Sequence, residues 1–141
     1  MVRTAPTTDL SPATLYAILR LRSEVFVVEQ ACAYLDPDGR DVEPGCVQLW
    51  VEDDDGTITA TARLLTEPDG HRIGRVCTAP AARSVGLGAA LVHAAIELAG
   101  AGPIVLAAQS QLVDWYATFG FEPTGREWVE DDIPHTEMRR P

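Results

Sequence analysis

The feature that most constrains this chain is a strand–helix–strand unit in its second half. Ile73–Thr78 predicts a strand that ends before Pro80, and residues 86–99 carry apolar side chains at helical spacing. Ile104–Ala108 is a short, wholly apolar run, which is typical of a central strand buried on both faces. Two strands of one sheet that are joined through a helix run parallel. The sequence therefore predicts one parallel pair of central strands.

The segments around this unit predict a long helix and strands that follow one another directly. Ser11 and Pro12 form a helix start, and the apolar residues after them predict a helix over residues 12–28. Residues 31–46 contain two proline–glycine turns and predict a loop. Consecutive strands favour antiparallel pairing, so we expect a mixed, mostly antiparallel α/β sheet flanked by helices in a single domain, residues 1–141. The remaining elements are strands at 47–52, 57–65, 124–130 and 135–140 and a helix at 110–119.

Charge and composition exclude several classes of protein. The net charge is -10, whereas a nucleic-acid-binding protein needs a basic face to neutralise phosphates. The three cysteines are odd in number and form no C-x-x-C pair, so we expect neither a disulfide framework nor a metal site. No stretch is apolar enough to span a bilayer, and the first six residues lack the apolar core of a secretory signal. We therefore expect a cytoplasmic protein with no nucleic-acid or membrane partner.

The turn that joins the strand to the helix carries the clearest chemical signal. Its glycines let the backbone approach a ligand closely, and the following helix start adds free N–H groups and a positive dipole end. The arginine adds a formal charge, so the turn is suited to a pyrophosphate. A plain glycine-rich turn is the alternative, but no Walker or dinucleotide-binding pattern is present. The turn consists of Arg83, Ser84, Val85, Gly86, Leu87 and Gly88.

This turn resembles the acetyl-CoA loop of the GNAT acetyltransferase superfamily, whose pattern is Arg/Gln-x-x-Gly-x-Gly/Ala. The resemblance continues at Tyr116-Ala117-Thr118-Phe119-Gly120-Phe121, where many members carry Tyr-x-x-x-Gly-Phe. Further runs are similar to the ElaA-like branch of the superfamily, and together they extend from about residue 10 to residue 139. These runs are residues 21–30, 73–76, 106–109 and 132–135.

The resemblance implies a fold, a co-substrate and a set of binding residues. The two parallel strands would splay apart to admit CoA, and the chain would move an acetyl group from acetyl-CoA to an amine, on a small molecule or a protein, by direct transfer in a ternary complex. The alternative is a GNAT module that binds or senses acyl-CoA without catalysis. A homodimer is compatible with either. Beyond the turn, the implied cofactor-binding residues are Val76, Cys77, Thr78 and Gln109.

Amide formation poses two proton problems, which point to candidate catalytic residues. An alkylammonium with a pKa of about 10 must lose a proton before it attacks, and a departing thiolate gains from receiving one. Tyr116 can donate to the thiolate, although Leu112, Tyr116 and Phe119 share a helical face that would also suit the core. Glu29, at the end of the first helix, and His135 are the candidate bases.

Two further patterns suggest other chemistry. Cys77, on the strand that would splay, could form an acyl-enzyme, but no histidine adjoins it in sequence and buried cysteines usually act as small hydrophobic residues. The acidic residues between 36 and 43 do not follow the order of a calcium-binding loop. We expect them to form an acidic rim that attracts an amine. They are Asp36, Asp38, Asp41 and Glu43.

Overall fold

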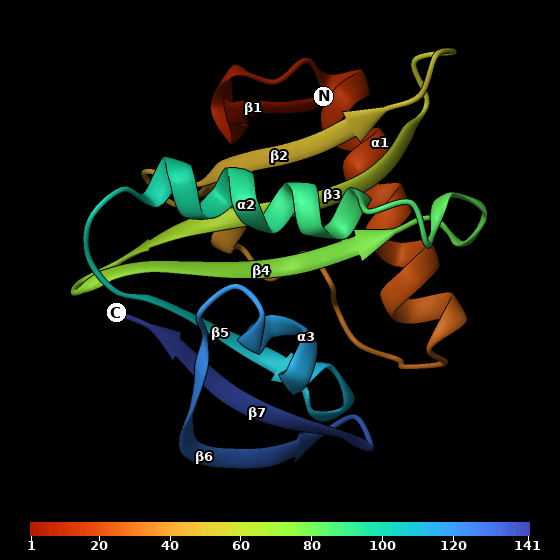
Figure 1. The fold of residues 1–141 in the computed structure, drawn as a ribbon. Coiled ribbons are helices and arrows are strands. Elements are labelled where there is room, and N and C mark those ends of the chain that lie inside the picture. Colours follow the sequence, from red (N-terminus) through yellow and green to blue (C-terminus); the bar gives the residue numbers. More distant parts are fainter.

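In the computed structural model, which describes residues 1–141, seven strands form one sheet in the order β1-β2-β3-β4-β5-β7-β6 (Figure 1). Only β4 and β5 run parallel, and every other neighbouring pair is antiparallel. The predicted mixed sheet with one parallel pair is therefore confirmed. The strands are β1 (Val2–Pro6), β2 (Val47–Glu52), β3 (Ile58–Glu67), β4 (Gly70–Thr78), β5 (Ile104–Gln109), β6 (Glu122–Glu130) and β7 (Ile133–Arg140).

Three α-helices cover the sheet: α1 (Pro12–Arg22), α2 (Leu87–Ala99) and the short α3 (Val113–Ala117). Helix α2 packs on one face of β2–β4, and α1 lies on the opposite face (Figure 1). On the α2 face the core is aliphatic and includes Leu91, Val92 and Ala95, which are fully buried. None of the helices is both long and apolar enough to cross a membrane.

Helix α1 begins as its sequence indicates but ends differently. The Ser11 side chain accepts the N–H of Thr14 at 3.1 Å, with proline at the first helical position. The sequence predicts one helix over residues 12–28, but α1 ends at Arg22. The chain then continues as a π-helical segment, Ser23–Glu29. The Cys32 N–H accordingly donates to the carbonyl five residues back, on Val27, at 3.1 Å. Such wide turns are frequent at functional sites.

The parallel pair is closed at one end and open at the other. Strand pairing between β4 and β5 covers only His71↔Ile104 and Arg72↔Val105. At the closed end, Gly70 lies so near Pro103 that a Cβ would overlap the Pro103 carbonyl oxygen. From Ile73 onward β4 has no partner on the β5 side, and the two strands diverge (Figure 1).

Two sequence expectations about the sheet were wrong. Strand β1 was not predicted, because its five residues form an edge strand with no alternation of apolar side chains. The apolar run of β5 is not buried on both faces, because it pairs with β4 only at Ile104 and Val105 and then lines the space that opens between the two strands. Ile104, Leu106 and Ala108 are buried, whereas Ala107 is exposed.

Candidate active site

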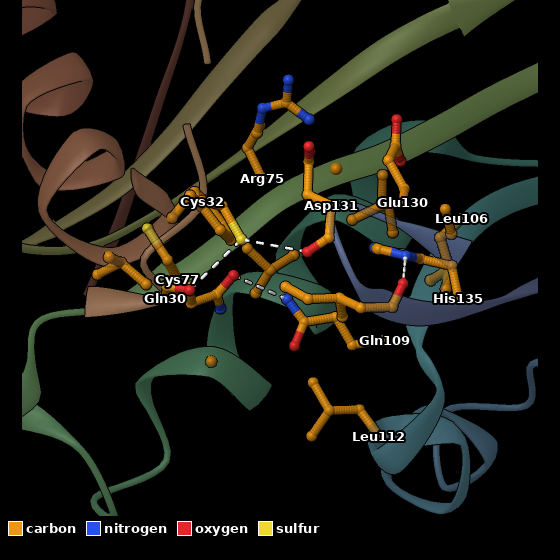
Figure 2. A pocket seen from close by; sticks show the side chains of 18 of the residues that line it. Gln30, Cys32, Arg75, Cys77, Leu106, Gln109, Leu112, Glu130, Asp131 and His135 are labelled. Atoms are coloured by element: carbon orange, nitrogen blue, oxygen red, sulfur yellow. Dashed lines mark hydrogen bonds between the residues drawn. The ribbon is translucent and has the colours of Figure 1, made fainter. Parts of the chain in front are cut away.

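A cavity of about 790 Å³ occupies the place where β4 and β5 diverge. Its walls also come from the π-helical segment and the loop after it, from α3 and from the β6–β7 turn. Figure 2 shows Gln30 and Gln109 meeting across it, where the Gln30 side chain accepts a hydrogen bond at 3.2 Å. Next to Gln30, the Cys32 thiol lies 3.4 Å from the Gln30 carbonyl oxygen and 3.7 Å from the Asp131 carbonyl oxygen. Segments far apart in the sequence therefore enclose one site.

The glycine turn, Arg83–Gly88, lies at one end of this cavity. Ser84 and Gly86 both take a positive φ, 70° and 85°, which turns the backbone sharply into α2. The backbone N–H groups of Ser84 through Gly88 donate no hydrogen bond within the protein. A run of free N–H groups at a helix start is suited to an anion.

Arg83 carries the formal charge of the turn and is already paired. Its guanidinium donates two hydrogen bonds of 2.6 Å to the Glu29 carboxylate and one of 3.1 Å to the Thr78 carbonyl oxygen. Hydrogen bonding to Arg83 lowers the pKa of Glu29. Glu29 is therefore a weaker base than an ordinary glutamate, and it does not line the cavity.

Tyr116 lines the cavity from α3 and is 8% exposed. Burial raises the pKa of its hydroxyl to about 12. Its ring packs edge-on against Trp115 and Phe121, which fixes its direction. The side chain therefore belongs to the core and also presents a protonated hydroxyl to the cavity.

His135 also lines the cavity, from near the start of β7. Its Nδ1 is 2.8 Å from the Ile133 carbonyl oxygen, and its ring stacks on Trp128. Because a carbonyl oxygen can only accept, Nδ1 carries the proton and a neutral ring leaves Nε2 with a lone pair. Figure 2 shows this ring beside Gln109 and across from Asp131. His135 is therefore arranged to accept a proton.

The unpaired part of β4 supplies the wall between these groups. Val76, Cys77 and Thr78 all line the cavity. Burial raises the pKa of the Cys77 thiol to about 12, so little thiolate forms at neutral pH. This environment disfavours a nucleophilic role for Cys77.

The expected acidic rim is not observed, because all four of its residues are paired with arginines. Glu43 contacts Arg40 at 3.1 Å, and the three aspartates contact a different set of arginines. Asp36 and Asp41 are buried, and the fully buried Arg22 contacts each of them at 2.7 Å. Asp38 contacts Arg63 at 2.7 Å, and this hydrogen bond holds its pKa well below the usual range. No three His, Cys, Asp or Glu side chains are arranged to hold a metal ion. We call this group the arginine–aspartate cluster: Arg22, Arg63, Arg75, Asp36, Asp38 and Asp41.

Many of the site residues predicted from the sequence line the cavity, but some do not. Those that line it are Val76, Cys77, Thr78, Arg83, Gly88, Gln109, Tyr116 and His135. The rest of the turn lies beside it, and Glu29 reaches it only through Arg83. Sequence reasoning missed Arg75 and the unpaired acids Glu130 and Asp131. The available signal for Arg75 was a charged residue inside the otherwise uncharged predicted strand Ile73–Thr78.

Known proteins share the family and the fold of this chain. The acetyltransferase (GNAT) domain family matches residues 24–140. The UPF0039 protein Rv2851c of Mycobacterium tuberculosis is 44% identical over 137 residues, which cover 94% of this chain and 88% of that protein. The crystal structure of an acyl-CoA N-acyltransferase from Pseudomonas aeruginosa has a TM-score of 0.91 and 39% identity, covering 100% of this chain and 99% of that one.

The Escherichia coli protein ElaA has the same fold. Its crystal structure has a TM-score of 0.94 and 35% identity, covering 100% of this chain and 99% of that one. The free N–H groups of the glycine turn and the diverging β4 and β5 are features of this chain itself. Sequence and fold agree, and the chain belongs to the GNAT acetyltransferase family, with ElaA among its relatives.

Proposed function

We propose that this protein transfers an acetyl group from acetyl-CoA to an amine acceptor, by direct attack within a ternary complex. The observation that carries the proposal is that one cavity holds Arg83, Tyr116 and His135 around an unpaired strand. A donor for the phosphates, a proton donor and a proton acceptor are the three groups that the reaction requires. The acceptor is an amine on a small molecule or on a protein.

The residues that would hold acetyl-CoA follow from the site. The N–H groups of the glycine turn and the Arg83 guanidinium suit the pyrophosphate. The backbone of Val76, Cys77 and Thr78 suits the amide-rich pantetheine arm, because this edge of β4 has no strand partner. Gln109 lies on the facing strand, where it can bind the same arm. Acetyl-CoA supplies the activated acyl group.

His135 and Tyr116 each carry out one of the two proton transfers. The amine nitrogen bonds to the thioester carbonyl carbon, and its proton passes to His135 Nε2. The carbon–sulfur bond then breaks, and the leaving sulfur takes the Tyr116 hydroxyl proton, which gives an amide and the CoA thiol. The Val76 N–H would donate to the carbonyl oxygen as negative charge builds on it, because the register with β3 turns the Cys77 N–H toward Thr61. His135 returns its proton to solvent, and Tyr116 regains one.

Between the two candidate bases, the surroundings favour His135. Glu29 is committed to Arg83 by two hydrogen bonds, and its pKa is lowered. His135 keeps one ring nitrogen free and lines the cavity. Covalent transfer through Cys77 is disfavoured because burial keeps its thiol protonated.

The test of the proposal is Tyr116→Phe, which keeps the ring and removes the hydroxyl. With acetyl-CoA and a panel of amines, read as free thiol and acetylated product, turnover should fall roughly 10- to 10³-fold. Acetyl-CoA affinity and melting temperature should stay near those of the parent, because the hydroxyl makes no hydrogen bond within the protein. If the parent binds acetyl-CoA but acetylates no amine, a binding or sensing module replaces the enzyme.

His135 calls for a matched pair of variants. Asparagine can still donate to the Ile133 carbonyl as Nδ1 does, whereas glutamine reaches toward the position of Nε2 without a basic nitrogen. Both should lower turnover by about 10²-fold or more if Nε2 accepts the proton. Parent-like turnover in His135→Asn, with chemistry shown to be rate-limiting, would remove His135 from the mechanism.

A further inference from the structure

Arg75 occupies an unusual backbone position in the middle of β4. Its φ is 53°, in the left-handed region that residues with a Cβ avoid. The pairing with β3 shifts here: Arg63 faces Gly74 and Thr61 faces Cys77, so two residues of β4 stand opposite Ala62 alone. This is a β-bulge, a device that re-aims the backbone and is frequent beside active sites. A strained bulge persists only where its surroundings hold it.

The surroundings that hold this bulge are contacts of the Arg75 side chain. Its Nε lies 2.8 Å from a carboxylate oxygen of Asp36, in a close ion pair outside hydrogen-bond geometry. Its terminal nitrogen donates to the Asp36 carbonyl oxygen at 3.1 Å and approaches Asp38 at 3.3 Å. Tyr34 lies under the guanidinium, 5.8 Å from it, and donates its hydroxyl to Asp36 at 2.9 Å. Each of these partners belongs to the loop after the π-helical segment.

Asp36 is itself fixed from the other side. It is 1% exposed, and its second carboxylate oxygen contacts Arg22 of α1 at 2.7 Å. The bulge, the loop and α1 are thereby joined through one buried carboxylate. The bulge lies at the open end of β4, next to the backbone of Val76 and Cys77 that lines the cavity.

We propose that Arg75 is a positioning residue for acyl transfer: its ion pairs with Asp36 and Asp38 hold the β4 bulge, and the bulge aims the Val76 N–H group at the thioester carbonyl. The Cys77 N–H points the other way, because the hydrogen bond from Ala79 to Thr59 and the pairing of Thr61 with Cys77 place it on the β3 side. The inference rests on the proposed function of this cavity. It also explains why the strain is tolerated, because the same contacts fix the loop that carries Tyr34 and Leu35 along the cavity wall.

A direct role for Arg75 in binding an acidic acceptor fits the charges less well. The cluster holds three arginines and three aspartates in mutual contact, so its formal charge is already balanced. The uncompensated charges on this side are the carboxylates of Glu130 and Asp131. In Figure 2, Arg75 and Leu112 lie at opposite ends of the cavity, so Arg75 is also remote from the 3₁₀ turn Ser110–Leu112 that precedes α3.

The experiment compares Arg75→Gln and Arg75→Lys with the control Arg72→Gln. Arg72 lies on the same strand and pairs with Glu67 at 2.8 Å, but it stands at the closed end. Arg75→Gln should lower kcat by about 10- to 10²-fold, Arg75→Lys should recover part of it, and CoA affinity should change less than about twofold. The control should match the parent in all three. Adding Asp36→Asn to Arg75→Gln should cost much less than the product of the single losses, since both act on one contact.

A readout without turnover separates this inference from the proposed function. Acetyl-CoA labelled with ¹³C at the carbonyl reports hydrogen bonding to that oxygen through its bound chemical shift. The shift should move toward the free value in Arg75→Gln and stay parent-like in Arg72→Gln, even if no amine acceptor is found. An unchanged shift in a folded, CoA-binding Arg75→Gln or Arg75→Lys protein would overturn the inference. So would a loss confined to KM for acidic acceptors, because that result would make Arg75 an acceptor-binding residue.

Discussion

The glycine turn and the arginine–aspartate cluster use charge in opposite ways on the two sides of one cavity. In the turn, a single arginine and a series of N–H groups without protein partners lie near the surface. In the cluster, six charged groups contact one another where the loop region that carries the aspartates meets α1 and the sheet. Arg22, Asp36 and Asp41 are buried there. Free donors can exchange partners when a ligand arrives, whereas a balanced and buried set cannot. The turn is therefore built to bind, and the cluster to hold shape.

The energetics of the two regions should differ for the same reason. An exposed ion pair such as Arg83–Glu29 contributes little to folding, because water and salt screen it. A buried group that loses its partner leaves an uncompensated charge in the interior. Equivalent substitutions in the two regions should thus affect different properties: affinity in the turn, and stability in the cluster.

The largest expected effect is on stability, from Arg22→Met. The change leaves Asp36 and Asp41 without their main cation, which should cost about 3–5 kcal/mol in the free energy of unfolding. Arg20→Met is the matched control, because Arg20 lies two residues earlier on the same helix with an exposed partner, Glu24, at 3.5 Å. Urea unfolding of the parent and the two variants measures the difference. Equal stability of the Arg22→Met and Arg20→Met proteins would remove the distinction between the regions.

The cluster should also make stability depend on acid. The pKa of Asp38 is lowered mainly by its hydrogen bond to Arg63. Burial acts to raise the pKa of Asp41, but Arg22, Gln48 and Arg63 together outweigh burial and lower it. A carboxyl whose folded-state pKa is depressed stabilises fully above its unfolded value of about 4, and this stabilisation is lost as the pH falls below it. Asp38→Asn should therefore be less stable than the parent at neutral pH and should converge with it in acid. A constant difference between the two unfolding curves, across that range, would contradict this assignment.

The next effect is on affinity, from Gly86→Val. Gly86 has open space around its Cα but a φ of 85°, so valine adds backbone strain and fills the region expected for the phosphates. Gly56→Val is a control with nearly the same strain, since Gly56 has a φ of 81° and equally open surroundings in a distant turn. Both should lose similar stability. Only Gly86→Val should abolish the thermal stabilisation by acetyl-CoA, and retained binding would exclude the turn as the phosphate site.

Sequence reasoning anticipated the turn but not the cluster, and the cause is contact range. The turn is six consecutive residues, so its motif is visible in the chain, and the helix after it begins at Leu87, one residue from its expected start. The cluster joins Arg22, Asp36, Arg63 and Arg75 from α1, a loop, β3 and β4. Acidic residues in a loop look the same in a sequence whether they are solvated or buried beside arginine. Only the sheet register shows which arginines reach them.

The smallest expected effect, a few-fold change in affinity, comes from Glu29→Gln and tests whether the turn is free to exchange partners. In the protein alone, Glu29 occupies both ends of the Arg83 guanidinium at 2.6 Å, so a pyrophosphate must compete with it for Arg83. Glutamine is uncharged and a weaker partner, and CoA should therefore bind about two- to fivefold more tightly to the variant. Pantetheine, which lacks the pyrophosphate, should bind both proteins equally.

Because Arg83 lowers the pKa of Glu29, the carboxylate stays ionised throughout the neutral range. The ratio of the two CoA affinities, variant to parent, should therefore not change between about pH 6 and pH 9. Titration calorimetry at several pH values measures this ratio, with Glu24→Gln as the control for loss of a charge in the same π-helical segment. Weaker CoA binding in Glu29→Gln would show that Glu29 helps to orient Arg83 toward the phosphates instead of competing with them, and the turn would then share the fixed character of the cluster.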